Sequence, residues 1–106
     1  MTKIINLTPH PIVITDGDSF PPSGKVARVD AIQSDAGSIN GIPVKTQTFG
    51  DIVGLPAPQN DTVFIVSAIV LAAAKEKGRT DVIAPDTSNA VRNDKGHIVS
   101  VPGFVK

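Results

Sequence analysis

The chain has 106 residues, the size of one small domain. Its ten basic and ten acidic residues cancel, so we expect no attraction to long nucleic acids or to an anionic membrane. Hydrophobic residues make up 41% and charged residues 19%, a balance typical of globular proteins that excludes an intrinsically disordered chain.

The N-terminal third contains three short segments rich in β-branched residues. Residues 3–7 and 12–15 predict two strands, or one strand that bends where Pro9 and Pro11 cannot donate ladder hydrogen bonds. Residues 25–30 alternate in polarity and predict another short strand.

The middle of the chain has weaker patterns. Residues 31–41 combine serines, aspartates and glycines without a clear period, and they predict an irregular segment. Residues 42–49 predict a strand, in which Pro43 favours an edge position or a strand start. Residues 50–60 predict a loop.

The strongest local pattern is a strand followed by a helix. Residues 62–66 form a continuous apolar run, typical of a strand buried on both faces. Ser67 predicts a helix cap, residues 68–77 predict the helix, and Gly78 predicts its end. Residues 82–84 predict a second strand, which completes a strand–helix–strand unit.

The C-terminal part predicts smaller elements. Residues 85–93 are polar and predict a helical turn that begins at Asp86 or Ser88. A hairpin follows, with strands predicted at residues 90–92 and 97–101.

These elements predict a single small α/β domain over residues 1–106. We expect a mixed β-sheet with one main helix, which follows a buried central strand.

Cysteine usage and hydropathy bear on the compartment. With no cysteine the chain has no disulfide framework, so we expect a reducing cytoplasm. Asn6, Pro9 and Pro11 interrupt the apolar residues near the N-terminus, which argues against a signal peptide. The longest apolar stretch, residues 63–74, is too short to cross a bilayer.

Standard ligand motifs do not match the sequence. A phosphate loop would need glycine where Ser19 stands, and a calcium loop that begins at Asp16 fails at Phe20 and Pro21. Two distant histidines without cysteine are a weak set of zinc ligands. We therefore expect no metal ion and no cofactor.

Candidate ligand-binding residues follow the two strands of the strand–helix–strand unit, where open α/β sheets bind ligands. Ser67 begins the helix, where free amides bind phosphate or carboxylate, although a purely structural cap is the alternative. Residues 85–88 follow the second strand. The Asp86 carboxylate and the hydroxyls of Thr87 and Ser88 either contact a ribose or a partner backbone, or cap a helical turn.

Arginines and histidines supply the remaining candidates. Arg28, Arg79 and Arg92 are the three arginines, and a guanidinium suits phosphate recognition. For Arg79 the alternative is a structural ion pair with Asp81, which is itself a candidate. His10, between two prolines, is a candidate base or ligand contact or else a turn residue, and His97 has a weaker case.

Several short segments occur in a recognisable order. They are INLTPH at residues 5–10, LPAP at 55–58, FIVS at 64–67 before the alanine-rich helix, RTD at 79–81 with Pro85, and Gly96 before a hydrophobic terminal strand. Together they resemble a family of small proteins carried by bacteriophages and prophage-bearing bacteria. The resemblance spans most of the chain, and it implies no particular activity and no particular functional residue.

We expect a binding protein more than an enzyme, because no nucleophile and base occur at a catalytic spacing. If the phage resemblance holds, the leading hypothesis is a cytoplasmic anti-defence protein that sequesters a nucleotide immune signal. One alternative is a protein-interaction or virion-accessory module that pairs with a host or phage protein through residues 42–49. Another is a small hydrolase that uses His10, Asp81 or Asp86. The sequence leaves a homo-oligomer open.

Overall fold

A four-stranded sheet carries the fold, in the order β1 (Lys3–Asn6), β6 (Thr62–Ile65), β7 (Val82–Pro85) and β10 (Phe104–Val105). The structure is a computed structural model that describes residues 2–106. Strands β1, β6 and β7 are parallel, whereas β10 runs antiparallel to β7, so the sheet is mixed as expected. The apolar run also lies where predicted, because β6 is an inner strand and its Phe64 and Ile65 are fully buried.

Helix α1 (Ala68–Glu76) follows β6 and confirms the strand–helix–strand prediction. Ser67 is the N-cap, and its hydroxyl accepts a hydrogen bond from the backbone N–H of Val70 at 3.4 Å. Gly78 follows the helix with a φ of +80°, a left-handed conformation that ends helices. Local chemistry therefore sets both ends of α1.

The hydrophobic core lies between α1 and one face of the central sheet. Alternate residues of a strand point to opposite faces, so Phe64 and Val66 share the face that packs against the helix. The other buried members of this cluster are Leu7, Ala27, Val70, Leu71, Ala74, Val82 and Ala84. Val29 and Ile52 extend the cluster at the base of a long hairpin.

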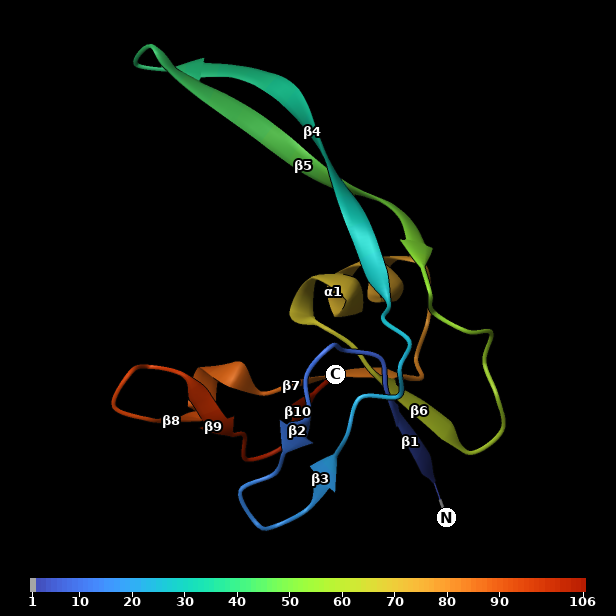
Figure 1. The fold of residues 1–106 in the computed structure, drawn as a ribbon. Coiled ribbons are helices and arrows are strands. Elements are labelled where there is room, and N and C mark those ends of the chain that lie inside the picture. Colours follow the sequence, from blue (N-terminus) through green and yellow to red (C-terminus); the bar gives the residue numbers. More distant parts are fainter. Residues whose placement is uncertain (1) are drawn as a thin grey trace.

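That hairpin consists of β4 (Arg28–Ile39) and β5 (Ile42–Val53), each twelve residues long. It projects from the rest of the molecule as an arm (Figure 1). The radius of gyration is 16.2 Å, compared with about 13 Å for a compact domain of this length, because the arm extends outward. Asn40 and Gly41 join the strands with φ values of +52° and +78°, as a type I′ turn requires.

The arm corrects three sequence-based expectations. The irregular segment predicted at residues 31–41 is wrong, because β4 continues through it to Ile39. The strand predicted at residues 25–30 begins only at Arg28. The loop predicted from residue 50 begins later, because β5 runs to Val53.

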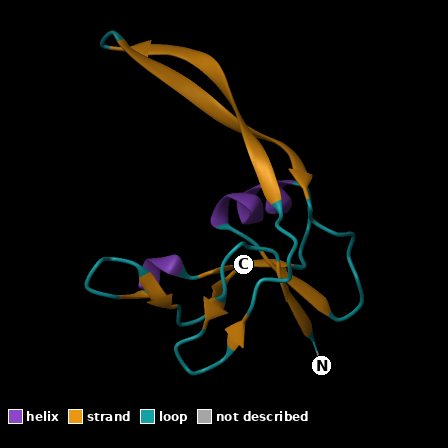
Figure 2. Ribbon diagram, in the orientation of Figure 1, coloured by secondary structure: helices purple, strands orange, loops and turns teal. Residues whose placement is uncertain are grey.

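Two small hairpins complete the fold, and Figure 2 shows them beside the central sheet. One pairs β2 (Ile12–Val13) with β3 (Ser19–Phe20), and the other pairs β8 (Val91–Arg92) with β9 (Ile98–Ser100). The 3-10 turn η1 (Thr87–Asn89) follows β7, so the predicted C-terminal turn and hairpin are confirmed. Strands β3 and β10 were not predicted.

Sheet structure dominates the molecule. Strands account for 47% of the residues and helices for 11%, so the α/β prediction holds only in the coarser sense of a mixed sheet with one main helix. Within residues 2–106 no helix is both long and apolar enough to cross a membrane.

Candidate functional site

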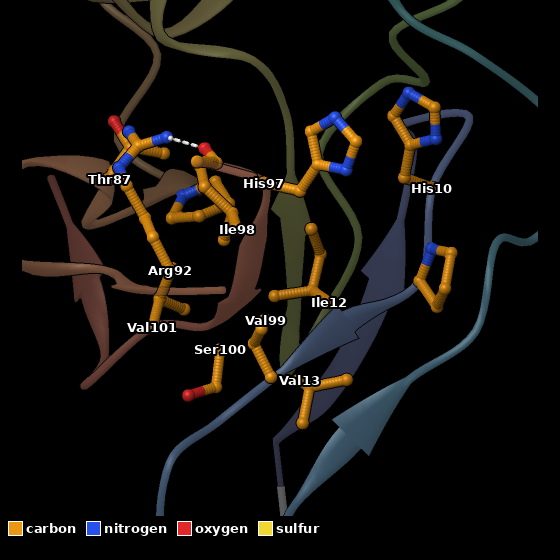
Figure 3. A pocket seen from close by; sticks show the side chains of 13 residues that line it. His10, Ile12, Val13, Thr87, Arg92, His97, Ile98, Val99, Ser100 and Val101 are labelled. Carbon is orange, nitrogen blue, oxygen red and sulfur yellow. Dashed lines mark hydrogen bonds between the residues drawn. The ribbon is translucent and has the colours of Figure 1, made fainter. Parts of the chain in front are cut away.

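A pocket of about 710 Å³ lies where the β1–β2 loop and β2 meet the β8–β9 hairpin and η1 (Figure 3). Its volume falls within the range of about 300–1,000 Å³ found for small-molecule sites. Two backbone hydrogen bonds of 2.9 Å join the β2 segment to the residue that follows β9. The Val101 N–H donates to the Val13 carbonyl, and the Thr15 N–H donates to the Val101 carbonyl. The pocket therefore depends on contacts between the two ends of the chain.

The pocket has an aliphatic lining. Ile12 and Val13 come from β2, and Ile98, Val99 and Val101 come from β9 or the residue that follows it. Ile98 is 45% exposed and Val99 is 52% exposed. Exposed aliphatic side chains that meet in a concave site offer a ligand apolar surface to cover.

The polar side chains of the lining are two imidazoles, one guanidinium and the hydroxyls of Thr87 and Ser100. His10 and His97 both line the pocket, and Figure 3 shows both imidazoles at the same end of it, above Ile12. Arg92 and the hydroxyl-bearing Thr87 line it as well. No aspartate or glutamate is among its thirteen lining residues, so the pocket suits an anion better than a cation.

A buried asparagine holds the loop that carries His10. Asn6 is 2% exposed, and its side-chain amide donates to the carbonyls of His10 at 2.8 Å and Phe20 at 2.9 Å. Its side-chain oxygen accepts hydrogen bonds from the Thr8 N–H at 2.9 Å and the Thr8 hydroxyl at 2.7 Å. Because every polar atom of this amide has a partner, the loop has a defined conformation.

A second asparagine organises the turn that carries His97. The side-chain oxygen of Asn93 accepts hydrogen bonds from the backbone N–H groups of Lys95 at 2.9 Å and His97 at 3.0 Å. Arg92 donates from Nη1 to the Gly96 carbonyl at 2.9 Å, which holds its guanidinium over the same turn. Arg92 and His97 are therefore positioned by one short hairpin.

Of the residues singled out in the sequence, His10 and Arg92 lie at this pocket. Six other candidates, Arg79 and Asp81 among them, do not line it. Ser67 caps α1, Asp86 accepts a hydrogen bond from the Asn89 amide at 3.0 Å, and Ser88 and Arg28 are exposed in η1 and at the base of the arm.

Arg79 and Asp81 form the structural ion pair that was the alternative for these residues. Arg79 donates from Nε and Nη2 to the two carboxylate oxygens of Asp81, each at 2.9 Å. Nη2 also donates to the Pro56 carbonyl at 2.9 Å, which ties the loop after the arm to the start of β7. The hydrogen bonds from Arg79 lower the pKa of Asp81 from its ordinary value, although burial opposes the shift.

A smaller pocket of about 360 Å³ lies next to this pair, at the base of the arm. Asp51, Lys77 and Arg79 contribute both signs of charge to it, together with Ile52 and Leu55. This mixed and open surface offers less selectivity for one class of ligand than the larger pocket does.

Sequence reasoning gave too little weight to two residues of the larger site and missed a third, Asn6. The Thr87 hydroxyl was named only as part of the segment 85–88, and His97 was given the weaker case of the two histidines. Asn6 had one usable signal, since it is the only polar residue between Ile4 and Leu7, where an unpaired amide would be costly.

Within residues 2–106 no group of three or more histidines, aspartates or glutamates could hold a metal ion. Comparisons with protein-family models, with curated proteins and with solved structures each found no match. The resemblance to phage proteins therefore stays a prediction from the sequence.

Proposed function

We propose that this protein binds and sequesters a small anionic ligand of the nucleotide type, without transforming it, in the pocket formed by His10, Thr87, Arg92 and His97. One observation carries the proposal. Nitrogen-bearing side chains from both ends of the chain meet over an aliphatic lining that contains no carboxylate.

The polar groups match the parts of such a ligand. Arg92 uses Nη1 to hold the Gly96 carbonyl, and its other N–H groups form no hydrogen bond with residues 2–106. A guanidinium with free N–H groups suits bidentate contact with a phosphate. The imidazoles of His10 and His97 and the Thr87 hydroxyl add hydrogen-bonding groups for further phosphate or sugar oxygens.

The lining favours a ligand with an apolar part. No aromatic side chain lines the pocket, so a nucleobase would pack on the aliphatic surface of Ile98 and Val99. We therefore expect phosphate contacts to supply most of the selectivity, and we expect the affinity to fall as salt screens them.

Sequestration would suit a phage-encoded protein, because a bound immune nucleotide no longer reaches its host effector. This role deepens the binding proposal and depends on it.

The test is calorimetry and thermal unfolding with cyclic dinucleotides, cyclic trinucleotides and ADP-ribose derivatives. We expect at least one of these ligands to bind and to raise the melting temperature. Arg92→Gln should raise the dissociation constant of that ligand by about tenfold or more, because hydrogen bonds to charged groups contribute about 1.5–3 kcal/mol. Absence of binding by every member of the panel would refute the proposal.

A matched control separates the pocket from general charge effects. Arg28→Gln removes the same charge from an exposed position outside the pocket, so its affinity should stay within about twofold of wild type. Equal losses in the two variants would mean that Arg92 acts only through net charge.

The hydrolase alternative makes a different prediction. Neither imidazole forms a hydrogen bond with a carboxylate within residues 2–106, and Asp81 is already engaged by Arg79. We expect bound ligand to be recovered unchanged after prolonged incubation. Steady turnover that His10→Ala or Asp86→Ala abolishes would favour the hydrolase instead.

A further inference from the structure

The two faces of the β4–β5 arm differ in chemistry. Three register pairs share one face: Ile39 with Ile42, Ser34 with Thr46, and Ile32 with Thr48. We call these six residues the uncharged arm face. The charged pair Asp35 and Lys45 belongs to the opposite face, together with Gln33 and Gln47.

The uncharged arm face is apolar and open. Ile32, Ile39 and Ile42 are 51%, 64% and 66% exposed. The hydroxyls of Thr46 and Thr48 donate to carbonyls of the neighbouring strand at 3.3 and 3.4 Å, so these side chains need no further partner. The face therefore presents mainly aliphatic groups, and the exposed Ser34 hydroxyl is the one side-chain polar group on it that forms no hydrogen bond within residues 2–106.

The rest of the described chain leaves this face uncovered. The core cluster contacts the arm through Val29 and Ile52, which pair with each other at its base. Beyond the base, the arm extends away from α1 and the sheet (Figure 1). A two-stranded ribbon is marginally stable in water, and it becomes stable when a further strand or another element packs against it.

The edges of the arm are poor places for that partner. Ile39 and Ile42 flank the two-residue turn, so alternation points the nitrogen of Pro43 to the outer edge, where it has no hydrogen to donate. On β4 the register shifts between Asp35 and Ser38, and Gly37 has a φ of +92°. Proline and bulges are features that discourage edge pairing.

We propose that the uncharged arm face packs against the same face of a second copy of this chain. The two arms run antiparallel about a two-fold axis level with the Asp35–Lys45 pair, which lies midway between the Ile39–Ile42 pair and the Ile32–Thr48 pair. Ile32 and Ile39 are separated by about 23 Å of strand, so the antiparallel arrangement places the tip isoleucines of each arm over Ile32 of the other. A two-fold contact of this kind closes on itself and leaves no free face.

Two observations favour a second copy over an unrelated protein, and the size of the strip limits how tightly it can bind. The face carries no charge, so two copies meet without like-charge repulsion. The arm extends away from the body, so antiparallel arms leave the two bodies at opposite ends. Each arm contributes a strip about 30 Å long and 10 Å wide, or about 600 Å² for both, which is below the roughly 1,200–2,000 Å² of stable specific interfaces and fits only a weak, transient contact. We therefore expect a dimer that dissociates in the micromolar range.

Sedimentation equilibrium of the full chain tests the proposal over about 5–500 µM, a range that brackets a weak interface. The mass should rise from the 11.0 kDa of a monomer towards twice that value. Ile32→Glu should raise the dissociation constant by about tenfold or more, because it places a charge in the interface. Gln33→Glu adds the same charge on the next residue, on the opposite face, and should change it by less than about twofold.

Circular dichroism checks that both variants fold. A second pair of single variants repeats the comparison at the tip of the arm, with Ile39→Glu on the uncharged arm face and Ser38→Glu as its control on the opposite face. A monomer at all concentrations, or equal effects of Ile32→Glu and Gln33→Glu, would overturn the proposal.

Crosslinking gives a second readout, because the natural chain has no cysteine. Packed sheets lie about 10 Å apart, which is too far for a disulfide but within reach of a short bis-maleimide. Thr46→Cys should give a covalent dimer, and Gln47→Cys should give little. The reverse pattern would show that the opposite face is the interface and would also overturn the proposal.

Discussion

The Arg79–Asp81 pair gives the most quantitative prediction. Replacing Arg79 with Met keeps most of the aliphatic stem but removes the guanidinium. The substitution breaks two hydrogen bonds to Asp81 and one to the Pro56 carbonyl. It also leaves the Asp81 carboxylate without its charged partner, in a site where the side chain is only 17% exposed.

The magnitude follows from these contacts. The pair is partly buried, so solvent screens it less than it screens a surface ion pair, and loss of one partner should cost about 2–3 kcal/mol. For a domain of this size, about 1 kcal/mol corresponds to about 4 °C, so the melting temperature should fall by about 8–12 °C.

The effect should depend on pH. Folding lowers the pKa of Asp81, mainly through the hydrogen bonds from Arg79. The stability from its ionised form is therefore fully present above the unfolded pKa of about 3.9, and it is lost as pH falls through the lower folded value. The difference between wild type and Arg79→Met should be full at pH 7 and should shrink below about pH 4.

Urea unfolding from about pH 2.5 to 7 measures this dependence. Arg28→Met is the matched control, because Arg28 is exposed and forms no side-chain hydrogen bond within residues 2–106, and it should change stability by less than about 0.5 kcal/mol. A constant difference between wild type and Arg79→Met across the whole pH range would refute the assignment of the pair.

Three further substitutions test how the fold positions the site and the arm. Asn6→Ala breaks two buried and two partly buried hydrogen bonds, so it should cost about 2–4 kcal/mol in urea and shift the NMR signals of His10; an unchanged His10 spectrum would contradict its positioning role. Gly54→Ala should lower stability by about 2 kcal/mol or more in thermal unfolding, because φ is +87° and the new Cβ would collide with the Val26 carbonyl. Ser67→Ala should cost about 0.5–1 kcal/mol in urea, since its capping bond is long, and a cost above about 2 kcal/mol would point to another contact.

The elements that could be predicted are those whose signals are local. Residues 62–66 form an apolar run, Ser67 can cap the helix that follows, and Gly78 can adopt the conformation that ends it. Each signal acts within a few residues, so one sequence is enough to recognise it.

The arm shows the opposite case. Strand β4 contains serines, aspartates and a bulge at Gly37 that interrupt its alternation, so by itself it has no strand pattern. It is a strand because β5 pairs with it across the Asn40–Gly41 turn. Strand propensity depends on the partner strand, and a partner cannot be identified from one segment alone.

In the candidate site, too, the residue types could be predicted from the sequence and their long-range contacts could not. The sequence by itself determined the types of side chain available, including the absence of cysteine and the small set of histidines and arginines. Only the tertiary structure decided that His10 and His97, from opposite ends of the chain, line one pocket, and that Arg79 is held by Asp81 away from it. The physical reason is that backbone hydrogen bonds between Val13, Thr15 and Val101 join two segments far apart in the chain. Backbone groups are the same in every residue, so neither segment's sequence indicates that the other is its partner.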